Sequence, residues 1–526
     1  MPIFLSIRLN YNPTMNTLYK LIESKCRHYG DRVFLQLEHD GKVNYLKFFN
    51  ELEKCNIFLS LQSNLKGGNY SIIAPNCVNY LLYLFCLQER GGAAVNLNSE
   101  LSPNELKVRL NIGKVSLLLT TASIYPKLAP FLAETGVQQV LLIDERAYGF
   151  SPPEMAKGPF GTIRYQDEGN QRAVAFLQFT GGTTGITKAA VISHRNIIGN
   201  IEQLNKHFGT YIDIDSLFVP IAFPFYHIFS IVFNVLFFLS NGGTCILYSD
   251  LRNIDLTIKL LKKHSINFTV GVNTWYRKLM QHPDFGDLDF SLTRVSLAGG
   301  EYVPVSTKQM WISMTGKPLY SAYGLTETSS LVIVSPLDES NLEDSIGILI
   351  PETKAVLLDD DGNELQSENV VGELALKGPQ VSNRYYEDPF ETAAAFHNDW
   401  FKTGDIAERI GGRIYRIIDR KKDMISVSGN KVYPNEVEAV ISELEDVLDV
   451  SVMAIKSGNS GEEVAACIVV KPRALLTDEA IIKHCRMYLV TYKVPRHVFR
   501  YLQLPKTPIG KTDRKTLKSE INNGNI

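Results

Sequence analysis

The sequence has few cysteines and almost no net charge, and each shortage argues against a class of protein. Its seven cysteines form no Cys-x-x-Cys pair, and their number is odd. That pattern predicts reduced, mostly buried thiols in a cytoplasmic protein rather than a disulfide framework or a zinc site. A formal net charge of −2 gives no electrostatic case for a nucleic-acid partner, which usually requires a face rich in lysine and arginine.

A leader segment and an uninterrupted apolar run are also missing. Residues 1–10 are mildly apolar but too short for the hydrophobic part of a signal peptide, so we expect no secretion. Residues 217–239 carry no charge, yet Pro220, Pro224 and His227 interrupt them. Because proline breaks a helix, this stretch favours a buried helix that starts near His227 over a membrane span.

The remaining composition is that of an ordinary globular protein with more than one domain. The chain has 526 residues, of which 45% are hydrophobic and 21% charged, and this length exceeds what one hydrophobic core usually serves. Helical periodicity in residues 45–59 and 80–88 alternates with apolar strands such as 70–74. This rhythm predicts an α/β fold with doubly wound, mostly parallel sheets.

The same rhythm continues into the middle of the chain and then changes. Apolar runs predict strands at 244–247, 268–270 and 295–298. Beyond about residue 330 the sequence shows short strands and turns, with a hairpin at 359–363 and a strand at 372–378. The second half of the large domain is therefore expected to contain a β-rich subdomain.

A glycine-rich loop directly after an apolar run is the strongest single indication of a ligand. Residues 174–179 predict a strand, and the loop that follows contains Thr180, Gly181, Gly182, Thr183, Thr184, Gly185 and Lys188. Such a loop can point backbone N–H groups at a phosphate. It is not a Walker A loop, because Lys188 follows Thr187 and precedes Ala189. A second turn, Gly299-Gly300-Glu301, follows a predicted strand and is expected to face the first across a cleft.

Further stretches identify a family. They are Tyr323-Gly324-Leu325-Thr326-Glu327, Lys402-Thr403-Gly404-Asp405, the segment 419–434 that contains Gly429, and the segment 505–511 that ends in Lys511. In this order and spacing they resemble the acyl-adenylate-forming superfamily, and most closely the bacterial long-chain fatty acid–CoA ligases. The resemblance runs from about residue 18 to residue 517. It implies an N-terminal AMP-binding domain over 1–419, a hinge over 420–423 and a small mobile α+β domain over 424–526.

The resemblance also implies an activity. Members of this family use ATP and Mg²⁺ to convert a carboxylic acid into an acyl-adenylate with release of pyrophosphate, and CoA then displaces AMP. For this chain we expect a long-chain fatty acid as the substrate. Two alternatives stay open: a ligase that passes the acyl group to an acyl carrier protein, and a non-catalytic descendant that only binds nucleotide or acyl groups. A homodimer and peripheral contact with the inner face of a membrane also stay open.

The resemblance also implies a role for individual residues of this chain. The residues that match nucleotide-binding or CoA-binding positions are Thr180, Gly181, Gly182, Thr183, Thr184, Gly185, Lys188, Gly299, Gly300, Glu301, Tyr323, Gly324, Asp405, Arg420 and Gly429. Among them, the loop 180–188 would hold the β- and γ-phosphates. Tyr323 would lie against adenine, and Asp405, assisted by Arg420, would accept hydrogen bonds from the ribose hydroxyls.

The catalytic roles are assigned in the same way. Lys511 matches the catalytic lysine that bridges the attacking carboxylate and the α-phosphate. Thr326 would contact the α-phosphate, and Glu327 would hold Mg²⁺, since a hard cation prefers carboxylate oxygen. His227 matches a position at the mouth of the acyl pocket. Gly429 would line the tunnel for the pantetheine arm of CoA after rotation about the hinge.

Two positions depart from the family pattern. Ala189 stands where the family loop commonly has glycine, and Asn383-Arg384 stands before Tyr385 where a glycine is usual. A positive φ angle at Ala189 would weaken binding, because a Cβ atom disfavours that conformation. Gly182 and Thr187 differ from the commonest loop in the way the fatty-acid ligase branch does.

Overall fold

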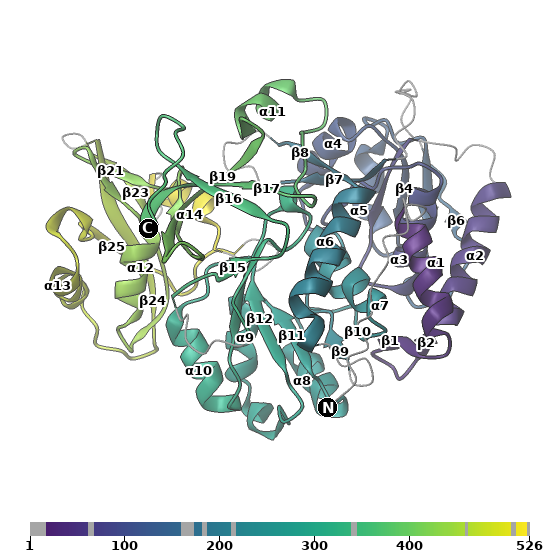
Figure 1. The fold of residues 1–526 in the computed structure, drawn as a ribbon, viewed down its shortest axis with the longest axis horizontal. Coiled ribbons are helices and arrows are strands. Elements are labelled where there is room, and N and C mark those ends of the chain that lie inside the picture. The colour runs from purple at the N-terminus through teal and green to yellow at the C-terminus, as the bar shows by residue number, and fades with distance from the viewer. Residues whose placement is uncertain are drawn as a thin grey trace. The chain divides into compact units, whose positions relative to one another are not determined.

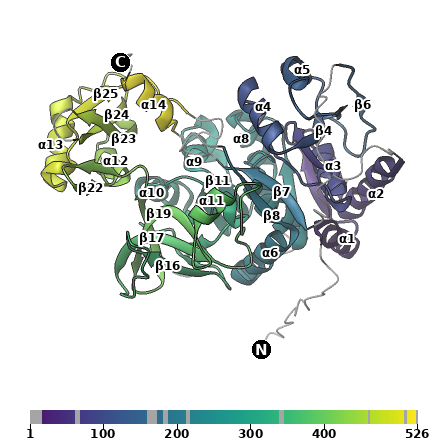
Figure 2. The same ribbon diagram turned by 90° about the horizontal axis from the view of Figure 1, so that it is seen from above.

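The computed structural model describes residues 17–61, 68–158, 173–180, 187–211, 217–337, 344–457, 461–506 and 512–522 (Figure 1, Figure 2). The described residues up to 251 form one compact unit, and those from 252 onward form a second. All seven cysteines are buried free thiols, as predicted. No helix in these described ranges is long and apolar enough to cross a membrane.

The first unit contains two mixed sheets. One has the strand order β2-β1-β10-β9, and the other has the order β3-β4-β5-β6. A hairpin of β7 and β8 joins the second sheet through Ala94, which pairs with both Tyr70 and Phe176. The strands are β1 (Val33–Leu37), β2 (Lys42–Asn44), β3 (Asn69–Ile73), β4 (Val115–Thr120), β5 (Gln139–Leu142), β6 (Glu154–Met155), β7 (Val174–Phe179), β8 (Ala189–Ser193), β9 (Phe218–Pro220) and β10 (Thr244–Leu247).

The parallel pairs of this unit confirm the α/β prediction. Strand β1 pairs in parallel with β10, and β4 lies in parallel between β3 and β5. Every residue of β3 and of β10 is buried, as expected for strands covered on both faces. The βα rhythm does not foresee three antiparallel pairs, which are β1 with β2, β5 with β6, and β7 with β8.

Helices pack around these sheets. In Figures 1 and 2, the purple helices α1, α2 and α3 lie side by side. All residues of α3 except its last are buried, because a helix that is apolar on every side belongs in a core. The helices of this unit are α1 (Leu18–Tyr29), α2 (Tyr45–Leu61), α3 (Val78–Glu89), α4 (Pro103–Ile112), α5 (Tyr125–Leu132), α6 (His194–Phe208) and α7 (Phe238–Ser240).

The apolar stretch near His227 is a buried helix, as predicted, but of an uncommon type. A π-helix, η3 (Ser230–Phe237), runs directly into α7, and all of its residues are buried. The rings of Phe229, Phe233 and Phe237 stack in sequence, with centroids 5.4 Å and 5.0 Å apart. A π-helix is rare and often lies at a functional site.

His194 links α6 to α1 through a buried hydrogen bond. Its Nδ1 accepts from the backbone N–H of Leu18 at 3.2 Å, and the residue is almost fully buried. Burial lowers the pKa of His194 from 6.5 to about 4. The folded protein therefore holds this imidazole in its neutral form at pH values where the unfolded chain would protonate it.

This difference predicts a pH-dependent loss of stability. Between pH 6.5 and 4 the unfolded state binds one more proton at His194, so the free energy of unfolding falls as the pH falls. From pH 7.5 to pH 5.5 the loss at this site should be about 1 kcal/mol. His194→Asn keeps an acceptor near Nδ1 and does not titrate, so its urea midpoint should fall less over this range. Parallel pH dependences of the two proteins would contradict this assignment.

The second unit contains three sheets. The first has the order β11-β12-β13-β14-β15, with its first three strands parallel, and the second is an antiparallel sheet of β16 to β20. The third has the order β22-β21-β24-β23, with β25 beside β24. The first two sheets contain β11 (Phe268–Gly271), β12 (Val295–Gly299), β13 (Tyr320–Tyr323), β14 (Ile333–Val334), β15 (Ile348–Leu349), β16 (Lys354–Leu358), β17 (Val370–Lys377), β18 (Phe396–His397), β19 (Trp400–Ile410) and β20 (Ile414–Arg420).

The third sheet forms the core of the C-terminal part with its helices, drawn in yellow-green in Figure 2. Its strands are β21 (Ile425–Val427), β22 (Asn430–Val432), β23 (Val447–Ser457), β24 (Gly461–Val470) and β25 (His497–Arg500). The apolar side chains of α12 and α13 pack against β23 and β24 in one cluster. The helices of the second unit are α8 (Ile254–Lys263), α9 (Asn273–Met280), α10 (Val305–Thr315), α11 (Pro389–Ala395), α12 (Pro434–Ser442), α13 (Asp478–Tyr488) and α14 (Arg514–Asn522).

The charged run 419–423 is partly strand. Asp419 and Arg420 end β20, and a turn follows. The carboxylate of Asp419 is buried and accepts from the backbone N–H of Asn435 at 2.8 Å, and burial raises its pKa to about 6. Arg514, the first residue of α14, lies 2.7 Å from Glu438 and 3.4 Å from Asp423. Contacts therefore hold both Asp419 and Asp423, the two ends of the run, and the hinge over 420–423 stays a prediction.

Candidate nucleotide site

Strands β13, β19 and β20 bring three of the predicted site residues together. Asp405 pairs with Arg420 across the antiparallel strands β19 and β20, and directly opposed residues point to the same face of a sheet. The Nε of Arg420 lies 2.7 Å from Asp405 Oδ1. The hydroxyl of Tyr323, at the end of β13, donates to Asp405 Oδ2 at 2.5 Å. Each oxygen of this carboxylate therefore accepts from at least one donor.

The environment of Asp405 makes it a fixed acceptor. Its side chain is only 3% exposed. Burial and the Asp405 charge raise the pKa of Tyr323 well above its usual value, so its hydroxyl stays a donor. Burial opposes the charge on Arg420, but the nearby carboxylate outweighs it and the pKa of Arg420 is raised. A carboxylate only accepts hydrogen bonds and has about four lone-pair sites, so it is a suitable group to receive hydroxyl donors of a ligand.

Two close backbone approaches shape this edge of the sheet. A Cβ atom on Gly299, at the end of β12, would lie 2.4 Å from the carbonyl oxygen of Ala322 in β13. A Cβ atom on Gly324 would lie 1.8 Å from the carbonyl oxygen of Ser330. Glycine is required at both positions, because any side chain would displace the neighbouring backbone. Glu301 accepts from the backbone N–H of Thr274 at 2.9 Å, which connects the turn after β12 to α9.

Thr326 and Glu327 lie on a short 3₁₀ turn, η5 (Thr326–Thr328), just after Gly324. Both residues are partly exposed. The Oε1 of Glu327 accepts from the hydroxyl of Tyr385 at 2.7 Å, and the Glu327 carbonyl oxygen accepts from the backbone N–H of Ser382 at 2.7 Å. Glu327 is therefore held through its side chain and its backbone.

The glycine-rich loop connects two antiparallel strands. Its residues 181–186 lie outside the described residues, but both ends of the loop are placed. Thr180 donates its backbone N–H to the carbonyl oxygen of Lys188 at 3.1 Å, and Phe179 pairs with Ala189. The loop is thus closed by the β7–β8 hairpin and not by the start of a helix.

The structure gives the backbone conformation at the two positions that depart from the family pattern. Ala189 is a buried strand residue and is not among the non-glycine residues with positive φ, so the weakening expected from such an angle does not arise. Asn383 and Arg384 are exposed and likewise have no positive φ. Glycine is not needed at either place in this chain.

The remaining predicted residues are not joined to the Asp405 cluster by the described contacts. His227 lies in the first unit, where its backbone N–H donates to the carbonyl oxygen of Pro224 at 3.0 Å just before η3. Gly429 lies on the exposed turn between β21 and β22 with φ of 82°. Lys511 lies outside the described residues, so its role stays a prediction.

Comparison with known proteins explains this arrangement. Residues 22–386 match the family of AMP-binding enzymes, and residues 436–511 match the AMP-binding enzyme C-terminal domain. The chain belongs to the AMP-binding enzyme family. This finding confirms the resemblance to acyl-adenylate-forming enzymes.

Curated relatives of this AMP-binding enzyme cover nearly its whole length. It is 34% identical to the long-chain-fatty-acid–CoA ligase of Salmonella typhimurium, over 96% of this chain and 94% of that protein. It is 36% identical to the protein of the same name from Escherichia coli O157:H7, over 86% of each. The Bacillus subtilis protein of that name is 27% identical, over 96% of this chain and 94% of its own length.

Solved structures agree on the fold. ATP-bound MatB from Rhodopseudomonas palustris matches with a TM-score of 0.83 at 23% identity, over 95% of this chain and 98% of that one. The anthranilate CoA ligase AuaEII in complex with anthranoyl-AMP matches with a TM-score of 0.82 at 19% identity, over 96% of each chain. This AMP-binding enzyme therefore has the fold predicted for it.

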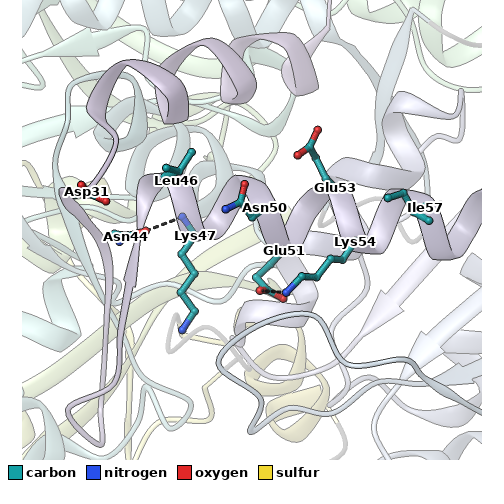
Figure 3. Close-up of a pocket in the computed structure, with 9 residues that line it drawn as sticks. All are labelled: Asp31, Asn44, Leu46, Lys47, Asn50, Glu51, Glu53, Lys54 and Ile57. Atoms are coloured by element: carbon teal, nitrogen blue, oxygen red, sulfur yellow. Dashed lines mark hydrogen bonds and ion pairs between the residues drawn. The ribbon is translucent and has the colours of Figure 1, made fainter.

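A surface hollow elsewhere in the AMP-binding enzyme contains none of the predicted site residues. Figure 3 shows it along α2, with a volume of about 550 Å³. Two of its charged side chains form an ion pair, since Lys54 lies 2.7 Å from Glu51. We assign no function to this hollow.

Proposed function

We propose that this AMP-binding enzyme is an ATP-dependent fatty acid–CoA ligase with two half-reactions. First, a carboxylate oxygen of the acid attacks the α-phosphorus of ATP, and the bond to the departing pyrophosphate breaks. The thiolate of CoA then attacks the acyl carbon, and AMP leaves with the bridging oxygen. The Asp405 cluster is the structural observation that best supports nucleotide binding, and the full-length relatives named above support the acid and CoA.

The chain's own residues supply binding and charge neutralisation in this proposal. Asp405, held by Tyr323 and Arg420, would accept from the ribose diol. The loop between β7 and β8 would surround the β- and γ-phosphates, and Thr326 would contact the α-phosphate. Positioning and electrostatic stabilisation account for most of the catalysis in phosphoryl transfer.

Mg²⁺ is part of the proposal, and the residues present fit it. Glu327 offers a partly exposed carboxylate, and no group of three or more His, Cys, Asp or Glu in the described ranges could hold a metal by itself. Such a donor set suits Mg²⁺, which is usually bound by one or two carboxylates together with substrate phosphates. When bound, the ion would neutralise charge on the phosphates. Glu327 would hold it beside Thr326.

The acyl chain is assigned to the first unit. The charge-free stretch 223–239 offers no partner for a second polar end of a substrate, and His227 would stand at its mouth. An unbranched acid should gain about 0.8 kcal/mol of binding free energy for each CH₂ that is buried.

Because long-chain acids partition into lipid, we include peripheral contact with the inner face of a membrane in the proposal. Co-sedimentation with lipid vesicles tests that contact, and light scattering tests for a homodimer.

The test is ATP–pyrophosphate exchange with acids of graded chain length, followed by AMP release with and without CoA. We expect exchange that requires the acid and Mg²⁺ but not CoA, the highest rates with medium or long chains, and net AMP release only with CoA. Transfer to acyl carrier protein in place of CoA would identify an acyl-AMP ligase. Absence of exchange with every acid would leave a binding protein, and faster turnover of acetate, benzoate or an amino acid would overturn the substrate class.

A further inference from the structure

Among the described residues, the hydroxyl of Tyr385 donates a hydrogen bond to the Glu327 side chain. It lies 2.7 Å from Oε1, while the Tyr385 side chain is nearly buried. A phenol that donates to one carboxylate oxygen fixes the rotation of the carboxylate group. The other oxygen, Oε2, is then left to face a ligand.

The segment around Tyr385 is itself firmly attached. Its backbone N–H donates to Thr392 Oγ1 at 3.0 Å, and that hydroxyl donates to the carbonyl oxygen of Asp388 at 2.6 Å. On the opposite side, the Ser329 hydroxyl donates to the carbonyl oxygen of Gln380 at 2.9 Å. Residues 380–385 and 327–329 therefore form a single hydrogen-bonded unit, and Tyr385 is not free to follow a moving carboxylate.

We propose that Tyr385 is a positioning residue that restricts Glu327 to one-oxygen coordination of the cation. The proposal rests on the proposed function, because it takes Glu327 as the residue that holds Mg²⁺. Mg²⁺ demands octahedral geometry and takes carboxylate oxygens one at a time, whereas Ca²⁺ readily accepts both oxygens of one carboxylate. A carboxylate with one oxygen engaged by a phenol should therefore discriminate in favour of Mg²⁺.

The test compares Tyr385→Phe with the unaltered enzyme. The substitution removes one oxygen atom and keeps the ring, so the apolar packing is retained. Mn²⁺ binding is measured by electron paramagnetic resonance in the presence of a non-hydrolysable ATP analogue, which requires no turnover. Loss of a residue that orients a metal ligand typically weakens metal affinity by 10- to 100-fold, and we expect Mn²⁺ affinity to fall by about tenfold.

The ratio of Ca²⁺ to Mg²⁺ affinity supplies a measurement that partial unfolding cannot imitate. Competition of each ion against Mn²⁺ gives this ratio within one protein sample. Tyr385→Phe should raise Ca²⁺ affinity relative to Mg²⁺, because the freed carboxylate can offer both oxygens. Tyr415→Phe is the matched control: Tyr415 is buried in β20, and removal of its hydroxyl should leave both quantities unchanged.

The outcomes separate this proposal from the proposed function. An unchanged Mn²⁺ affinity and an unchanged Ca²⁺ to Mg²⁺ ratio in Tyr385→Phe would overturn the positioning role. Unchanged Mn²⁺ binding in Glu327→Gln would overturn it too, because the cation would then lie elsewhere. If the enzyme binds Mn²⁺ with the nucleotide but activates no fatty acid, the proposed function fails while the metal measurements still decide the role of Tyr385.

Discussion

Lys511→Ala should lower the rate of acid-dependent pyrophosphate exchange by about a hundredfold to a thousandfold, a loss typical of removing one preorganised charge stabiliser. The ammonium group would reduce repulsion between the attacking carboxylate and the α-phosphate and would stabilise the charge that develops between them. Formation of acyl-CoA from supplied acyl-adenylate should stay within a few-fold of the unaltered enzyme, because that step no longer involves the displacement at phosphorus.

Lys515→Ala is the control for this prediction. Lys515 is an exposed residue of α14, close to Lys511 in sequence, so it tests for a general effect of losing positive charge nearby. We expect little change in either half-reaction. Equal loss of both half-reactions in Lys511→Ala would show that the lysine is needed for structure or for both steps.

Gly429→Leu should have the reverse effect. Lys511 and Gly429 both belong to the C-terminal part of the sequence. The resemblance to the family implies that each reaches the nucleotide site at a different step, through a rotation about a hinge that we expect at Lys422. A leucine side chain would fill the pantetheine tunnel that Gly429 is proposed to line. We expect thioester formation from acyl-adenylate to fall by about a hundredfold or more, as a small misplacement at a reacting centre can do, while pyrophosphate exchange persists.

The structure provides a matched control for Gly429→Leu. Gly429 and Gly411 both have positive φ, both lie on exposed turns between adjacent strands, and a Cβ atom on either would meet no atom within 4 Å. Each leucine substitution therefore carries a similar backbone strain, roughly 1–2 kcal/mol. Gly411→Leu should leave both half-reactions intact. If Gly429→Leu impaired both half-reactions to the same extent, the alternation of the C-terminal part would have to be abandoned.

Much of the fold could be predicted from local pattern. The bounds predicted for β7 and β10 are those observed, because each is a compact apolar run that leaves little choice of register. The helical period of residues 45–59 likewise identified α2. These elements depend on their own side chains, so the sequence contains enough information to place them.

What could not be predicted depends on partners distant in sequence. The antiparallel pairing of β7 with β8 and the strand conformation of Arg420 are set by neighbouring strands, and neither has a local pattern. The same holds for the site. Motif positions pointed to Asp405, Arg420 and Glu327, but the hydrogen bond from Tyr385 to Glu327 spans 58 residues and has no sequence pattern.

The most direct test of the central claim follows the oxygen atoms of the acid. The fatty acid is labelled with ¹⁸O in its carboxylate and converted to acyl-CoA by the enzyme with ATP and Mg²⁺, and the AMP and pyrophosphate are then analysed by mass spectrometry. If a carboxylate oxygen attacks the α-phosphorus, one ¹⁸O atom enters each AMP molecule and none enters pyrophosphate. Unlabelled AMP, or label in a phosphate released from the β- or γ-position, would contradict the acyl-adenylate mechanism proposed for this enzyme.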